Sequence, residues 1–204
     1  PTARADTPVS PGQEATSQLF LLVLIPAIGI GVLVMVLLTY AVFKFRARKG
    51  NSHGPASPKT HDRRLETLWT VIPALILLLV GIATFQTLRI TDTIPENPDV
   101  IVEVWAQQWS WTFNVTYTNN GTSINTTGEL MIREGQVVKL LLRSVDVAHA
   151  FSIPAFNLKV DVIPGHENVY WFQALRTGDY DIYCAEFCGL RHYSMLATLH
   201  VVSA

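Results

Sequence analysis

Two long uncharged apolar runs occupy the N-terminal part of the chain. No charged residue interrupts residues 19–43 or residues 68–88, which are rich in Leu, Val, Ile, Ala and Gly. The first run holds 25 residues, and at about 1.5 Å per helical residue it exceeds the ~30 Å hydrocarbon thickness of a bilayer. The second holds 21, which is long for the core helix of a soluble domain, and Trp69 stands where indole rings favour the headgroup region. We predict two transmembrane helices.

The pattern changes after residue 90. Residues 91–98 have the composition of a linker, and six short β-rich runs alternate with turn residues beyond it: 100–105, 109–117, 137–143, 169–174, 180–184 and 195–202. Asn119-Asn120-Gly121 predicts a tight hairpin turn. Short strands at such spacing predict a sandwich or barrel. The sequence therefore divides into a tail and two-helix hairpin (1–90) and an all-β domain (91–204).

Charge gives this arrangement an orientation. The net charge is only −1, but residues 44–64 carry seven basic side chains and one acidic one. Between two apolar runs, such a connector indicates the cytoplasmic side of the membrane rather than a nucleic-acid surface. Both termini and the β domain are then expected on the outer, periplasmic side. That domain has twelve acidic and six basic side chains over residues 90–204, a balance of −6.

Soft metal ligands are concentrated near the C-terminus, in the order Cys184-x-Glu186-x-Cys188-x-x-x-His192-x-x-Met195. Thiolate, imidazole and thioether donors select copper over magnesium, calcium or manganese. Cys188, His192 and Met195 alone would suit a mononuclear blue-copper loop, but Cys184 adds one sulfur too many. Two thiolates on one loop can bridge two copper ions, with the Glu186 carbonyl as a further donor.

This hypothesis requires a second histidine from upstream, and His149 is the candidate. The alternative for the cysteines is a disulfide, which an extracytoplasmic chain usually forms, but the neighbouring histidine and methionine argue against it. Asp146, Asp161 and Tyr193 could support the ligands. The remaining histidines fall in polar loops, a turn or a strand and are interpreted as solvated or structural: His53, His61, His166 and His200.

The copper string closely resembles the dinuclear copper A motif of cytochrome c oxidase subunit II. The resemblance extends over nearly the whole chain and includes Asp146-Val-Ala-His149, Lys159-Val-Asp161-Val-Ile-Pro164-Gly165, Gln108-Trp109-Ser110-Trp111 and Glu66-Thr-Leu-Trp69-Thr-Val-Ile-Pro73. It implies a membrane-anchored, cupredoxin-like Greek-key barrel. It also implies that copper is held by His149, Cys184, Glu186, Cys188, His192 and Met195.

Further roles follow from the same resemblance. Trp109 would receive electrons from cytochrome c, whereas Trp111 is expected to pack in the core. Asp146 would help to dock the donor, and the acidic balance of the domain fits a basic one. The Glu186 carboxylate would help to bind a magnesium or manganese ion at the seam with subunit I. Glu66 would lie at the entrance of a proton channel, although an acid there also suits a helix N-terminus.

The expected function is that of subunit II of a haem-copper terminal oxidase in a respiratory membrane, together with subunit I and subunit III. Electrons from cytochrome c or another small donor would pass through two copper ions to a haem in subunit I. Oxygen would be reduced to water there, coupled to proton translocation. The chain has no Cys-x-x-Cys-His haem motif. The rivals are a quinol oxidase subunit, which typically lacks the copper ligands, a copper A nitric oxide reductase and a membrane-tethered copper carrier or assembly protein.

Overall fold

The computed structural model describes residues 7–46 and 61–204, which form two compact units. One unit covers Gln18–Gln86 and holds most of the two helices. The other combines the residues up to Ser17 with Thr87–Ala204 and holds all the strands. Most of the basic connector, including His53, lies outside the described residues.

The two predicted helices are present, and each extends beyond its uncharged run. Helix α1 spans Pro11–Phe45, with proline at the first helical position and Ser10 before it; the Ser10 hydroxyl accepts the Gln13 N–H (3.1 Å). Helix α2 spans Arg63–Asp92 and follows Asp62, whose carboxylate accepts the Arg64 N–H (3.1 Å). Each helix begins before its uncharged run because the polar residue that caps its N-terminus lies upstream of that run.

Neither helix buries a residue within this chain. By length and composition both can cross a membrane. Their apolar side chains are therefore left for lipid or for partner subunits to cover.

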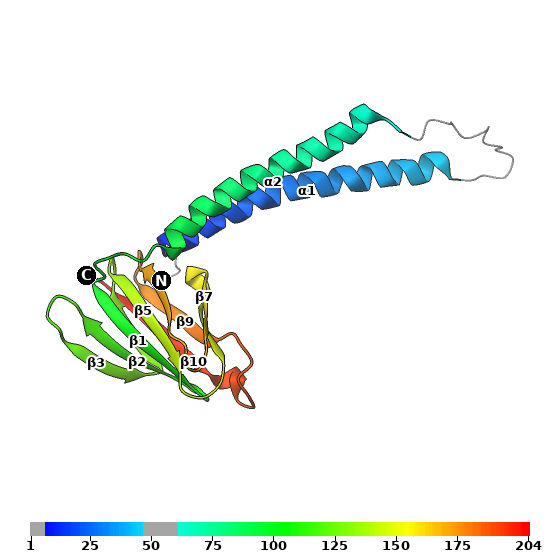
Figure 1. Ribbon diagram of the computed structural model, residues 1–204. Coiled ribbons are helices and arrows are strands. Elements are labelled where there is room, and N and C mark those ends of the chain that lie inside the picture. Colours follow the sequence, from blue (N-terminus) through cyan, green and yellow to red (C-terminus); the bar gives the residue numbers. More distant parts are fainter. Residues whose placement is uncertain (1–6, 47–60) are drawn as a thin grey trace. The chain divides into compact units, whose positions relative to one another are not determined.

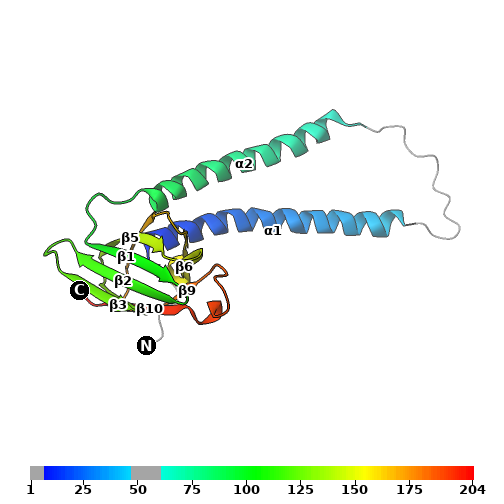
Figure 2. The same ribbon diagram turned by 60° about the horizontal axis from the view of Figure 1, so that its bottom comes forward.

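The β unit consists of two five-stranded sheets (Figures 1 and 2). The first has the order β3-β2-β1-β5-β8, formed by Ser123–Thr127, Ser110–Tyr117, Val100–Gln107, Val137–Ser144 and Asn168–Gln173. The second has the order β4-β10-β9-β6-β7, formed by Glu129–Arg133, Leu196–Val202, Gly178–Cys184, His149–Ile153 and Leu158–Val162. The pairs β1–β5 and β4–β10 are parallel and the other pairs are antiparallel, which gives the expected cupredoxin-like sandwich.

The core lies between the sheets and follows from alternation along the strands. Alternate residues of β1 and of β5 are fully buried: Val100, Val102 and Val104, and Val138, Leu140 and Leu142. This is the period of two that places side chains on opposite faces of a strand. Trp111 is also fully buried, as expected, and packs edge-on against Phe151 with 5.2 Å between ring centroids.

The candidate metal ligands lie together at one end of the sandwich. Strand β9 ends at Cys184, and β6 begins at His149; the two strands are antiparallel neighbours, with Phe151 opposite Cys184. The segment after β9 carries Glu186 and Cys188 and contains a short 3-10 turn, His192–Ser194, before β10 begins. Neighbouring strand ends thus bring together residues that are 35 positions apart.

Candidate metal centre

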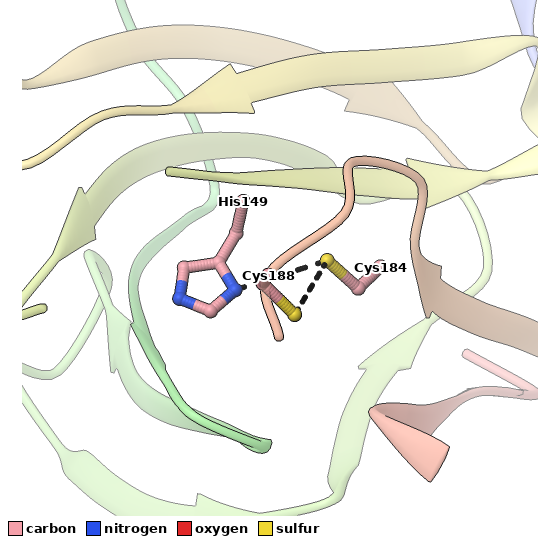
Figure 3. Close-up of side chains that lie close together, drawn as sticks. All are labelled: His149, Cys184 and Cys188. Atoms are coloured by element: carbon pink, nitrogen blue, oxygen red, sulfur yellow. Dashed lines mark hydrogen bonds between the residues drawn. The ribbon is translucent and has the colours of Figure 1, made fainter. Parts of the chain in front are cut away.

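Cys184 and Cys188 are both buried, and their Sγ atoms lie 3.7 Å apart (Figure 3). A disulfide bond needs about 2.05 Å between the sulfurs. Both cysteines are therefore free, and the disulfide alternative does not hold in this structure. The spacing leaves both sulfurs available to bind metal.

Four further donors surround the two sulfurs. The Nδ1 of His149 lies 3.8 Å from the Cys184 sulfur, and the Cys184 thiol donates to the Glu186 carbonyl at 3.1 Å. The Cys188 sulfur lies 3.5 Å from His192 Nδ1 and 3.8 Å from the Met195 sulfur. Ligands that share one metal at bond lengths of about 2.0–2.3 Å are separated by roughly 3.3–3.8 Å when their arrangement is tetrahedral. Both spacing and donor softness therefore fit copper.

Backbone hydrogen bonds fix the loop that carries most of these donors. The Cys184 N–H donates to the Met195 carbonyl (3.1 Å), and the Ala185 N–H donates to Ala150 next to His149 (2.8 Å). The His192 N–H donates to the Gly189 carbonyl (3.1 Å). The loop consequently curls back on itself and places Met195 in the core, fully buried.

Asp146 orients the upstream histidine. Its Oδ1 lies 2.9 Å from His149 Nε2, while His149 itself is fully buried. With the proton on Nε2, the Nδ1 lone pair faces the sulfurs, as a metal ligand requires. Desolvation acts to raise the pKa of Asp146, but hydrogen bonds from the Gln108 N–H, His149 and the Val147 N–H outweigh it and lower that pKa.

Burial, together with the neighbouring Cys184, raises the pKa of the Cys188 thiol to about 11. Cys188 is therefore a neutral thiol at pH 7 when no metal is bound. Because the thiolate is the form that binds metal, copper uptake must release this proton.

Comparison with known proteins decides the family. Residues 5–87 match the family described as cytochrome c oxidase subunit II, transmembrane domain, and residues 118–202 match its periplasmic domain. A probable cytochrome c oxidase subunit 2 of Rickettsia bellii is 30% identical, over 96% of this chain and 78% of that protein. The chain belongs to the cytochrome c oxidase subunit II family.

Other relatives agree. Cytochrome c oxidase subunit 2 of Cereibacter sphaeroides is 29% identical, over 90% of this chain and 70% of that protein. A chain in a solved heme-copper terminal oxidase dimer has a TM-score of 0.51 at 25% identity, over 68% of this chain and 99% of that one. The protein is thus a membrane-bound subunit of a cytochrome c oxidase complex, with two transmembrane helices and a periplasmic domain that carries the candidate copper site.

Trp109 of this subunit II lies against the loop between β9 and β10, residues 185–195, which carries most of the candidate copper ligands. It is partly buried, and the Arg191 guanidinium lies over its ring at 5.9 Å from the centroid. Gly189, which follows Cys188, adopts φ +116°, and a Cβ built there would lie 3.6 Å from the indole and 2.8 Å from Gln108 Nε2. The bare backbone of Gly189 therefore allows Gln108 and Trp109 to approach the loop closely.

Replacing Gly189 with Ala is expected to lower the stability of the loop of residues 185–195 by about 1–3 kcal/mol, because alanine is strained at φ +116° and its Cβ would displace the Gln108 amide from the Cys188 carbonyl. Gly121→Ala is the matched control, since Gly121 also has a positive φ (67°) but nothing within 4 Å of its added Cβ. Copper retention and thermal unfolding of both variants test this. Equal copper retention in the two would contradict the close fit.

The other residues singled out in the subunit II sequence occupy separate places. Glu66 lies in the first turn of α2, where its carboxylate accepts the Asp62 N–H (3.2 Å) and pairs with His61 (2.6 Å); its channel role stays a prediction. The Glu186 side chain is exposed, while its carbonyl faces Cys184.

The other histidines of the β unit lie outside the candidate site: His166 is exposed, and the His200 Nδ1 lies 2.6 Å from an Asp179 carboxylate oxygen. Tyr193 is 78% exposed, and the Asp161 backbone carbonyl accepts a hydrogen bond from Asn168.

The structure adds two residues that the sequence analysis did not assign to the site. Gln108 donates from Nε2 to the Cys188 carbonyl (2.7 Å), and Gly189 allows that approach. The sequence Cys188-Gly189 does not by itself show that Gly189 has a positive φ. The Gln108 side chain can hydrogen-bond to many groups, so its sequence position does not show that it donates to Cys188. The only indication was the position of Gln108 beside Trp109.

Proposed function

We propose that this subunit II receives electrons from a small soluble donor and passes them to a haem in subunit I. Two copper ions held by Cys184, Cys188, His149, His192, Met195 and the Glu186 carbonyl would supply a one-electron relay. The observation that supports this most strongly is the packing of four further donors, two imidazoles, a thioether and a carbonyl, around two sulfurs 3.7 Å apart. A single metal would leave part of this set unused.

The protein's own residues keep this site rigid and dry. His149 is oriented by Asp146, Met195 is fully buried, and both cysteines belong to the core cluster that also contains residues of both sheets. A cage of this kind changes little in geometry when its charge changes by one electron, because strand ends and the backbone hydrogen bonds of the loop hold its ligands. Small reorganisation permits fast transfer at a small driving force.

The remaining assignments complete the proposal. Cytochrome c, or a similar donor, would deliver electrons at Trp109, and Asp146 would help to dock it. The Glu186 carboxylate would face a magnesium or manganese ion at the seam with subunit I. Glu66 would lie at the entrance of a proton channel on the cytoplasmic side. The complete complex, with subunit III, would reduce oxygen to water and move protons across a respiratory membrane, with both termini and the β domain of this chain outside.

Metal analysis and electron paramagnetic resonance on the full chain in detergent test the relay. We expect two coppers per chain and one unpaired electron shared equally between them. A single copper with its own hyperfine pattern would contradict the dinuclear site. Copper held only as exchangeable Cu(I), readily removed by a chelator, would favour the copper-carrier alternative.

A further inference from the structure

We infer that Gln108 is a positioning residue that locks together the two segments carrying the copper ligands. This inference rests on the proposed function, because it concerns the geometry of the same donors. Gln108 lies in the turn between β1 and β2, which belong to the first sheet, whereas the ligand-bearing segments belong to the second sheet. A single residue in a turn of the first sheet therefore contacts both the histidine segment and the cysteine loop.

The side chain holds the cysteine loop. Gln108 Nε2 donates to the Cys188 carbonyl at 2.7 Å, across 80 positions of sequence. The next residue, Gly189, presents only backbone to this amide, because a Cβ there would lie 2.8 Å from Nε2. The contact fixes the peptide that follows the sulfur-bearing residue, and with it the direction of the Cys188 side chain.

The backbone holds the histidine segment. The Gln108 N–H donates to Asp146 Oδ2 at 2.6 Å, and the other carboxylate oxygen lies 2.9 Å from His149 Nε2. The Val147 N–H also donates to Asp146, at 2.6 Å. Gln108 is thus connected to His149 through a single carboxylate whose two oxygens are both occupied.

These contacts predict that loss of the Gln108 side-chain hydrogen bond changes the geometry of the proposed copper site more than it changes the stability of the domain. The Cys188 sulfur touches His192 and Met195, and the Cys184 sulfur touches His149. If Gln108 releases the Cys188 peptide, the relative placement of the two sulfurs becomes free to change. The electronic signature of the site depends on that placement, whereas the stability of the β-sandwich depends mainly on its core.

The test replaces Gln108 with Met, which keeps the length of the side chain and removes its donor. Gln107→Met is the matched control, since Gln107 is the exposed neighbouring residue at the end of β1. Gln108→Glu serves as a second variant of nearly the same shape that cannot donate to a carbonyl. The full chains are purified in detergent and loaded with copper. Their spectra, reduction potentials, thermal unfolding and rates of copper loss to a chelator are then compared.

We expect both Gln108 variants to alter the spectrum and the potential and to lose copper about five- to tenfold faster than Gln107→Met, as the loss of one hydrogen bond predicts. Unfolding of the copper-free chains should be similar in all variants. Unchanged spectrum, potential and copper loss in both Gln108 variants would overturn the positioning role while leaving the dinuclear site intact. A wild-type chain without a dinuclear signature would overturn both proposals.

Discussion

Replacing Cys188 with Ser is expected to abolish the dinuclear copper centre. A serine hydroxyl does not ionise near pH 7 and is a hard, poor bridging ligand for copper. Cys188 also touches His192, Met195 and Cys184, so its loss removes the link among three other donors. The copper content should fall from two ions to at most one per chain, and the thiolate-to-copper absorption should change completely.

The control for this experiment lies on the same loop. Tyr193 is 78% exposed, and Tyr193→Phe should retain both coppers and the native spectrum. Circular dichroism of the copper-free chains should show that the serine variant still forms the β-sandwich. Two coppers and an unaltered spectrum in Cys188→Ser would remove the basis of the assignment.

Replacing Trp109 with Ala is expected to slow electron uptake from reduced cytochrome c by roughly 100-fold, the scale associated with a central interface tryptophan of about 2–4 kcal/mol. On the proposed function, the indole forms part of the contact surface for the donor; in the structure it lies next to Gly189, which directly follows Cys188. Removing it takes away both the proposed contact surface and an aromatic group that lies beside Gly189. Stopped-flow reduction at saturating copper measures the effect.

Trp105→Ala is the matched control for Trp109. The Trp105 ring is covered by Arg143, whose guanidinium lies 5.3 Å from the ring centroid. This variant should keep a near-native rate of reduction and full copper content. Rates that fall equally in the two variants would argue for general damage to the domain and against a specific role for Trp109.

Much of the fold was predictable because its periodicities are long or strongly marked. The apolar runs 19–43 and 68–88 lie within α1 and α2, and the six predicted strands match β1, β2, β5, β8, β9 and β10 within two residues at each end. The predicted turn at Gly121 is present, with φ +67° and a hydrogen bond from the Tyr117 N–H to the Thr122 carbonyl (2.9 Å).

Four strands were not predicted, and each has a physical reason. Strand β3 has a single apolar residue, Ile124, so it has no apolar alternation to recognise. Strands β4, β6 and β7 have five residues each. Strand β6 is buried at every position and therefore also lacks alternation. It pairs with β7, which follows after only four residues, and with β9, whose distant position in the sequence no local pattern reveals.

The candidate site was predictable to a different degree. The donors Cys184, Cys188, His192 and Met195 share one loop, so their spacing alone indicates a metal, and His149 follows from the unfilled coordination. The contacts of Gln108 with Cys188 and Asp146 depend on how the two sheets face each other. No sequence pattern reports that packing.

All six donors belong to a single compact unit of one polypeptide. On the proposed assignment the ligand set closes within one polypeptide, so it needs no residue of another chain. We therefore expect this chain to take up copper before it joins the large subunit.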